Sequence, residues 1–129
     1  MSDSLSSTDN HLEFGLKIIR DKIRFGHEPD NPTLIPLWLN QESVLCPNIH
    51  EPIELHRDHY EKQFRLLLET IVDELVPSHW RQLCLNHIYQ PLGALKRIAD
   101  DKQSEQDLQR LVHELSITSH YVATSLCKI

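Results

Sequence analysis

The stretch IELHRDHYEKQFRLLLETIVDELV, residues 53–76, decides the fold class. Its apolar residues recur at spacings of three and four, which is the repeat of one buried helix face. Pro52 suits the first turn of a helix, and Pro77 cannot continue one. We therefore predict a helix from about residue 52 to residue 76. The predicted stripe consists of Ile53, Tyr60, Phe64, Leu67, Leu68, Ile71 and Leu75.

Two more amphipathic stretches follow, over residues 78–98 and 104–126. Ser78 is expected to cap the first of these helices, and Ser104 with Asp107 resembles a capping box for the second. Short connections favour antiparallel packing of consecutive helices. Because no alternation of apolar and polar residues is long enough for a strand, the predicted fold class is all-α. The stripe of the last helix includes Leu111, Val112 and Leu115. The predicted core joins Trp80, Phe64, Leu67, Ile71, Leu111 and Leu115.

The first helix is predicted over residues 11–25. Asn10 can cap it, Glu13 follows three residues later in the capping-box position, and Gly26 supplies a left-handed stop. Residues 1–9 are polar and rich in serine. Such a segment has too little apolar surface to pack, so we expect it to be a flexible tail.

Residues 26–51 interrupt the helical pattern. Four of the seven prolines of the chain lie in this stretch, so no long helix is expected to cross it. It also holds too many apolar residues to remain in water as a mobile linker. We predict an ordered arm packed along the bundle, with one short helical turn near residues 36–41. The expected architecture is a small bundle of four main helices, with this proline-rich arm between the first and the second. Residues 10–129 are expected to form a single helical domain.

The composition of the chain limits its expected location and its expected classes of partner. The formal net charge of −6 repels a polyphosphate backbone, so nucleic-acid binding is not expected. No stretch approaches the roughly 18 apolar residues of a membrane span, and the first residues lack the pattern of a secretion signal. The three cysteines are widely separated and odd in number, which is typical of reduced thiols in a cytosolic protein. We predict a cytoplasmic protein without membrane partners.

His87 lies four residues before Pro91 in the helix predicted over residues 78–98, and both positions fall near the core stripe. Pro91 lacks the backbone donor that would pair with the carbonyl of residue 87, so we expect a bend between Asn86 and Gln90. Buried polar groups need partners. We therefore predict that His87 is a structural core residue whose ring pairs with a polar group freed by the bend.

An alternative role for His87 comes from the segment NHIYQPLGAL, residues 86–95, and the turn and amphipathic helix after it. This arrangement resembles the dimerisation hairpin of sensor histidine kinases, in which a phosphoacceptor histidine precedes a proline–leucine pair. That histidine is usually five residues before the proline, where this chain has Asn86, and Ile88 replaces its acidic neighbour. The resemblance implies a histidine-phosphotransfer-like signalling domain in which His87 is the phosphoacceptor.

The nine histidines raise a further alternative, a metal-binding helical bundle. His56 and His59 lie one helical turn apart, and His113 and His120 lie two turns apart. His59 is expected to point nearly away from the apolar stripe, so the first pair does not converge. We interpret these residues as solvated surface histidines and predict no metal or other cofactor. With only three glycines the usual phosphate-binding loops are excluded, and no enzymatic activity is expected.

The sequence also carries more apolar surface than a small bundle can easily cover. In the first helix, a second apolar stripe lies about 160° around the axis from the first. Either the proline-rich arm or another chain must cover such surfaces, and a symmetric homodimer is the simplest cover. We predict a non-enzymatic protein-binding module, acting as an adaptor, assembly chaperone or regulator and forming a homodimer. The predicted partner-binding residues are Phe14, Ile18, Phe25, Trp38, Ile117 and Tyr121.

Overall fold

The computed structural model describes residues 2–45 and 50–126, with the side chains of residues 13–43 and 50–122. Every regular element within these ranges is a helix, which confirms the all-α class. The described chain has six helices, so the prediction of four main helices was wrong. They are α1 (Ser2–Phe25), α2 (Leu34–Leu45), α3 (Ile53–Val72), α4 (Ser78–His87), α5 (Tyr89–Ile98) and α6 (Lys102–Leu126).

Helix α1 begins at Ser2, well before the start predicted at residue 11. No glycine or proline precedes Asn10, so nothing in the sequence breaks the helix there, and the supposed capping residue lies inside it. The flexibility expected of residues 1–9 stays a prediction. The predicted end is confirmed, because Gly26 adopts a φ of 62°. A Cβ atom at Gly26 would lie 3.0 Å from Val76 Cγ1, so the position also has no room for a side chain.

The segment predicted to be an arm contains helix α2, which has 12 residues. The Leu37 N–H donates to the Thr33 carbonyl oxygen over 3.0 Å, which makes Thr33 the residue that precedes the helix. Pro36 is then the third helical residue, where its missing N–H costs no helical hydrogen bond. The prediction of one short turn over residues 36–41 was therefore wrong, because a proline in the first turn does not interrupt a helix.

Helix α3 ends at Val72, before the predicted end at residue 76. The Asp73 carboxylate accepts the N–H of Leu75 over 3.0 Å and turns the chain out of the helix. Leu75 is consequently 94% exposed, and its assignment to the buried stripe was wrong. The other large apolar residues in the second half of that stripe, including Phe64, Leu67 and Ile71, are buried as predicted.

The predicted helix over residues 78–98 is divided into α4 and α5 at Ile88. This break lies within the region where Pro91 predicted a bend. Pro91 is the third residue of α5, so the first turn of a new helix accommodates its missing donor. Pro77, and not Ser78, precedes α4, and no side chain caps that end.

The start of α6 is capped by a different pair of residues from the one expected. The Ser104 N–H donates to Asp101 Oδ1 over 2.7 Å, and the Asp101 N–H donates to Ser104 Oγ over 3.2 Å. Asp101 is thus the capping residue, and Ser104 lies inside the helix, so the predicted role of Ser104 with Asp107 was wrong. The hydrogen bond from the Ser104 N–H to the Asp101 carboxylate, and after it the Ser104 side chain, lower the pKa of Asp101.

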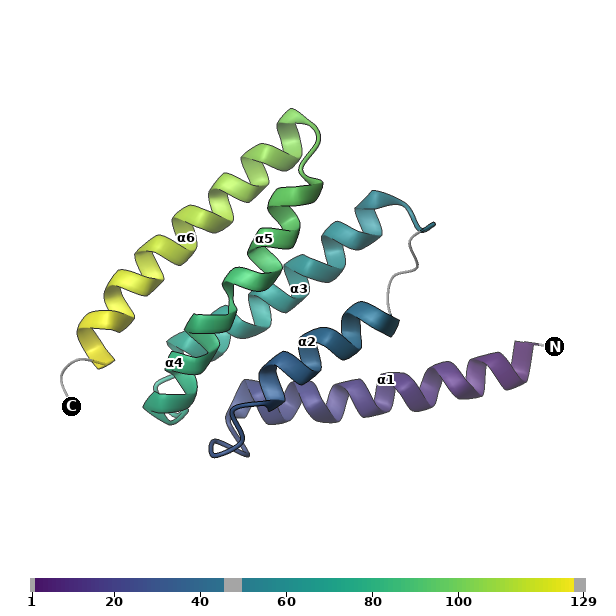
Figure 1. Ribbon diagram of the computed structural model, residues 1–129, viewed down its shortest axis with the longest axis horizontal. Coiled ribbons are helices and arrows are strands. Elements are labelled where there is room, and N and C mark those ends of the chain that lie inside the picture. Colours follow the sequence, from purple (N-terminus) through teal and green to yellow (C-terminus); the bar gives the residue numbers. More distant parts are fainter. Residues whose placement is uncertain (1, 46–49, 127–129) are drawn as a thin grey trace.

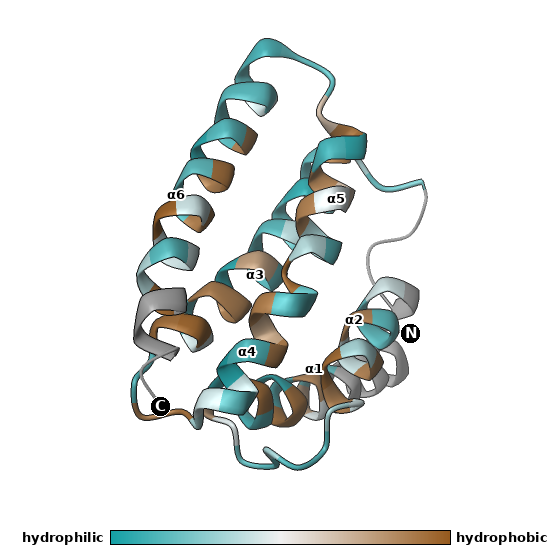
Figure 2. Cartoon of the chain, turned by 60° about the vertical axis from the view of Figure 1, so that its left-hand side comes forward, coloured by the Kyte–Doolittle hydropathy of each residue, from teal (hydrophilic) through white to brown (hydrophobic). Residues whose placement is uncertain are grey.

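Helix α3 lies at the centre of the bundle and contacts α1, α4, α5 and α6. Helices α5 and α6 form a hairpin on one side, and α2 packs against α1 and α4 on the other (Figure 1). The apolar sides of these helices turn toward one another (Figure 2). The N-terminal part of α1 reaches beyond the ends of α2 and α3 (Figure 1).

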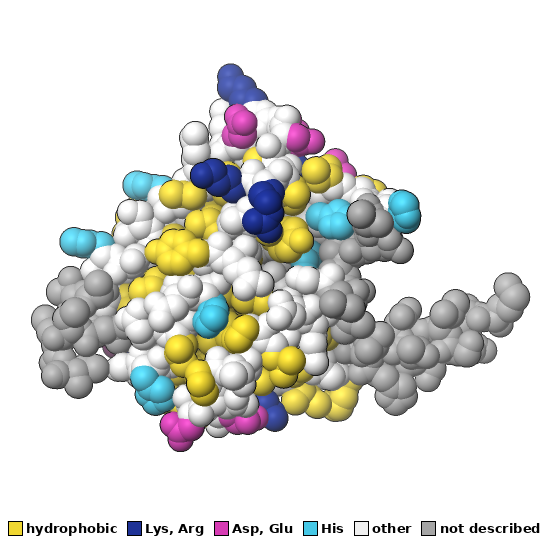
Figure 3. Space-filling model, in the orientation of Figure 1, with side chains coloured by type: hydrophobic (Ala, Val, Ile, Leu, Met, Phe, Trp, Pro, Cys, Tyr) yellow, Lys and Arg dark blue, Asp and Glu magenta, His cyan; other side chains and the backbone are white. Residues whose placement is uncertain are grey.

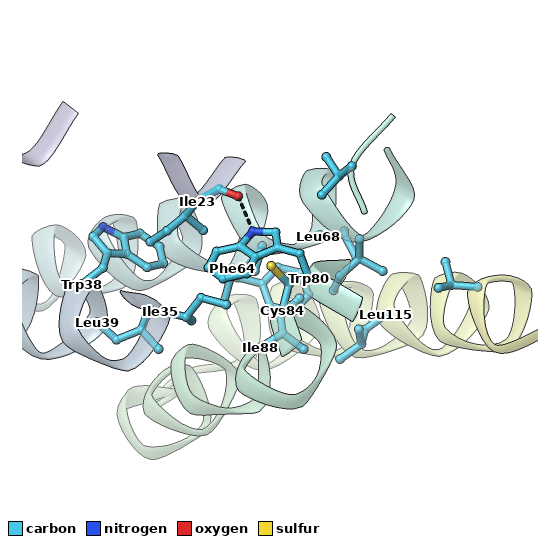
Figure 4. Packing of buried hydrophobic residues seen from close by; sticks show 14 of the residues in the cluster. Ile23, Ile35, Trp38, Leu39, Phe64, Leu68, Trp80, Cys84, Ile88 and Leu115 are labelled. Atoms are coloured by element: carbon cyan, nitrogen blue, oxygen red, sulfur yellow. Dashed lines mark hydrogen bonds between the residues drawn. The ribbon is translucent and has the colours of Figure 1, made fainter. Parts of the chain in front are cut away.

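The core links the two sides of the bundle through Trp80. Its indole N–H donates to the carbonyl oxygen of Ile23 over 2.8 Å, which connects α4 to the end of α1 (Figure 4). The predicted core is confirmed, since all six of its residues are buried in one cluster. That cluster includes Ile23, Leu34, Ile35, Trp38, Leu39, Phe64, Leu67, Ile71, Trp80, Cys84, Ile88, Leu111, Leu115 and Val122.

Candidate functional site

The outer face of α1 carries three of the predicted partner-binding residues. Phe14, Ile18 and Phe25 are spaced by four and seven residues, so they share one side of the helix. Their exposed fractions are 66%, 43% and 51%. The opposite side of the helix buries Leu16 and Ile23. The apolar residues of this helix therefore face both the bundle and the solvent.

Phe25 differs from its two neighbours on this face because groups of its own chain cover part of its ring. The Arg24 guanidinium lies 5.1 Å from the ring centroid, and the His27 ring stacks on it at 5.8 Å between centroids. Such contacts stabilise an exposed aromatic ring modestly. Phe14 and Ile18 are therefore the more open part of the outer face.

The other three predicted residues do not join this surface. Ile117 and Tyr121 are exposed on α6, which lies on the opposite side of the bundle from α1 (Figures 1 and 2). Trp38 is 1% exposed and belongs to the core, so its assignment to a partner surface was wrong. Because the segment folds as a helix, Trp38 shares the buried side of α2 with Leu34, Ile35 and Leu39.

A buried polar cluster joins α1, α2 and α3. The Glu42 side chain accepts hydrogen bonds from the indole N–H of Trp38 and, over 3.0 Å, from Nε of Arg20. Glu42 is 4% exposed, and His59 Nδ1 lies 3.7 Å from its other carboxylate oxygen. Burial by itself lowers the pKa of Arg20, but the hydrogen bond and charge of Glu42 outweigh it and raise that pKa overall. The cluster therefore joins α2 to α1 by an ion pair and brings the His59 imidazole of α3 close to the same carboxylate.

His59 lies in this cluster rather than on the solvated surface predicted for it. Its side chain is 10% exposed, and burial lowers the pKa of its imidazole, although the Glu42 charge acts in the opposite direction. Its Nε2 atom and the Gln63 amide nitrogen are buried without a hydrogen-bond partner among the described residues. Sequence periodicity missed this contact because the helix that carries Glu42 was not expected.

His87 is half-buried at the end of α4. Within the described part of the chain its ring makes no hydrogen bond, so the predicted pairing with a polar group freed by the bend is not seen. The neighbouring Asn86 instead accepts a hydrogen bond from Gln82 over 3.1 Å. His87 is thus neither a fully buried core residue nor a member of a polar network.

The side chains that the structure describes, those of residues 13–43 and 50–122, form no metal-binding cluster. No three His, Cys, Asp or Glu side chains there lie close enough together to hold a metal ion. Cys84 is a buried free thiol whose pKa burial raises to about 12, so it is not a reactive thiolate. Cys46 and Cys127 lie outside the described residues. No helix in residues 2–45 and 50–126 is long and apolar enough to cross a membrane.

A shallow groove between α5 and α6 was not predicted. It encloses about 590 Å³, and its apolar lining includes Tyr89, Leu92 and Val112. Apolar side chains gather over these two helices on the face that Figure 3 shows. Val112 is 46% exposed in this groove, so its assignment to the buried stripe of the last helix was wrong. The helical period placed Val112 at the edge of that stripe, where burial depends on how closely α5 approaches.

Comparison of the chain with protein-family models, with curated proteins and with solved structures gave no match.

Proposed function

We propose that this protein is a non-enzymatic, cytoplasmic protein-binding module, acting as an adaptor, assembly chaperone or regulator. In this proposal the outer face of α1 is the contact surface. The observation that carries it is the open pair of Phe14 and Ile18 on the side of α1 that faces away from the bundle.

The energetics favour covering this face. Burying a large apolar side chain completely contributes roughly 1.5–3 kcal/mol relative to leaving it in water. Phe14 and Ile18 gain little of this in the isolated chain, since they are 66% and 43% exposed. Exposed charges, including Glu13, Lys17 and Asp21, lie close by on the same helix. Apolar residues with a charged border are typical of a protein interface, whose rim stays hydrated.

The test replaces the open pair with polar residues, as Phe14→Ser with Ile18→Ser. A matched control is Leu55→Ser with Val72→Ser, because these two side chains on α3 are exposed to a similar degree. A partner identified by co-purification is then purified and titrated against each variant by calorimetry. We expect the α1 variant to bind at least about tenfold more weakly, which corresponds to about 1.4 kcal/mol.

Circular dichroism establishes that both variants are folded. Equal affinities of the wild type, the α1 variant and the α3 control would contradict the proposal.

A histidine-phosphotransfer role of His87 is a second hypothesis, favoured by one observation. His87 is half-buried rather than enclosed by the core, and its ring makes no hydrogen bond within the described part of the chain. Incubation with a small phosphodonor should then give acid-labile phosphate on the wild type but not on His87→Gln. The matched control is His113→Gln, because His113 is an exposed histidine on another helix. Absence of such phosphate in the wild type would remove this hypothesis.

A further inference from the structure

The charges beside the outer face of α1 identify what could cover it. Lys17 and Asp21 lie one helical turn apart on the same side of the apolar residues, and both are exposed. Neither forms an ion pair with any described residue. Three basic neighbours on the same helix are paired, Arg20 with Glu42, Lys22 with Glu28 and Arg24 with Asp73. Among the side chains of α1 that the structure describes, Lys17 and Asp21 are thus a positive and a negative charge left for another molecule.

The flank that carries Lys17 and Asp21 is also open. Between α1 and α3 lies a groove of about 420 Å³, and Lys17, Asp21 and Arg24 contribute to its wall. Charged side chains of α3, including Asp58 and Glu61, line the opposite wall of this groove, but none of them forms an ion pair with Lys17 or Asp21. The N-terminal part of α1 reaches past the ends of α2 and α3 (Figure 1).

The order of the two charges suits a second copy of the same helix. In an antiparallel pair related by a two-fold axis, the same flank of each helix faces the other copy. A residue before the axis then lies opposite the residue that follows the axis by the same number of positions. An axis near Ile19 places Lys17 of each copy opposite Asp21 of the other. The same register places Phe14 near Phe25 of the second copy, so apolar residues meet apolar residues. A parallel pair would instead bring Lys17 toward the opposite flank, where Lys22 already pairs with Glu28, so no acid is left there for Lys17.

Resting on the proposed function, we infer that the partner on the outer face of α1 is a second copy of this chain. The two α1 helices pack antiparallel, with Phe14, Ile18 and Phe25 at the contact and two symmetric Lys17–Asp21 pairs at its border. Self-association and the binding of another protein then use the same face of α1.

A charge-exchange experiment tests the register. The mass of the wild type is measured by sedimentation equilibrium over a wide concentration range, and we expect a monomer–dimer equilibrium. Lys17→Asp and Asp21→Lys each replace two attractive pairs by two repulsive ones, so each should weaken dimerisation by about tenfold. Lys17→Asp combined with Asp21→Lys in one chain restores the pairs and should restore dimerisation. A mixture of the two single variants should form heterodimers in preference to either homodimer.

Lys96→Asp on α5 is the control for the change in net charge, and it should dimerise like the wild type. A wild type that stays monomeric at every concentration overturns this inference. The proposed function fails separately, when Phe14→Ser with Ile18→Ser leaves binding of a purified partner unchanged. A dimer whose stability none of the charge variants changes also overturns the inference, because its contact then lies elsewhere.

Discussion

Helices α3 and α2 are both rich in apolar residues, yet the sequence predicted the first and missed the second. In α3 the apolar residues are separated by polar ones at helical spacing, so one buried face is evident. In α2 they form a run, LIPLWL over residues 34–39, with a proline inside it. The buried members of that run, Leu34, Ile35, Trp38 and Leu39, do follow a helical period, and Leu37 is exposed between them. A proline therefore predicts the end of a helix only when its position within the helix is known.

The largest expected effect compares two leucines that the sequence placed on one stripe. Leu67 is fully buried, so Leu67→Ala should lower the free energy of unfolding by about 2–5 kcal/mol through lost burial and a cavity. Leu75→Ala makes the same chemical change at a residue that is 94% exposed, and it should change that free energy by less than about 0.5 kcal/mol. Urea denaturation followed by circular dichroism measures both. Similar losses for the two variants would contradict the observed end of α3 at Val72.

This pair of residues also shows where sequence patterns stop being informative. The period of three and four correctly predicted the burial of Phe64, Leu67 and Ile71, because a packed face repeats along a regular helix. It failed at Leu75, where the Asp73 side chain ends the helix through one hydrogen bond. Periodicity assumes that the helix continues, and it contains no information on such a local stop.

The candidate site was predictable in part for a similar reason. The exposure of Phe14, Ile18 and Phe25 followed from the second stripe of α1, since a helix cannot turn both sides to one core. The cluster around Glu42 was not predictable, because Arg20, Glu42 and His59 meet in space from three separate helices. Nothing in the spacing of these residues along the chain indicates that contact.

A smaller effect is expected from the ion pair between α1 and α2, and it tests whether that region depends on polar contacts. Arg20→Met leaves the Glu42 carboxylate buried without its cation, which should lower the free energy of unfolding by about 1–3 kcal/mol. This value lies below that of a fully buried pair because the Arg20 side chain is one-third exposed. Lys62→Met is the control, since its pair with Asp58 is exposed and should contribute at most about 1 kcal/mol.

Urea denaturation again measures the effect. Equal losses for Arg20→Met and Lys62→Met would show that the surroundings of Glu42 stabilise its charge without Arg20, and that the contact between α1 and α2 rests on apolar packing alone. In the variant that combines Arg20→Met with Glu42→Gln, the loss should be less than the sum of the two single losses, because the carboxylate charge is absent.

The smallest expected effect concerns His59 and tests whether α2 covers α3 closely enough to bury an imidazole. Burial lowers the pKa of His59 from its ordinary value of 6.5, against the attraction of Glu42 and with the help of the Arg20 and His56 charges. The unfolded chain therefore binds a proton at His59 more readily than the folded chain does. As the pH falls through 6.5 toward the lower folded value, the contribution of His59 reduces the free energy of unfolding. Above 6.5 the imidazole is neutral in both states, and this contribution is constant.

The measurement is urea denaturation of the wild type and of His59→Gln at a series of pH values on both sides of 6.5. The rest of the chain is the same in both proteins, so the informative quantity is the difference between the two curves. We expect the free energy of unfolding of His59→Gln to fall less steeply than that of the wild type as the pH decreases below 6.5, since one proton-linked contribution is absent.

The matched control for removing one imidazole is His113→Gln, because His113 is exposed. Parallel curves for the wild type and His59→Gln would mean that His59 is as accessible to protons in the folded chain as in the unfolded one. Helix α2 would then not enclose the histidine, and the contact between Glu42 and His59 would belong to an open surface.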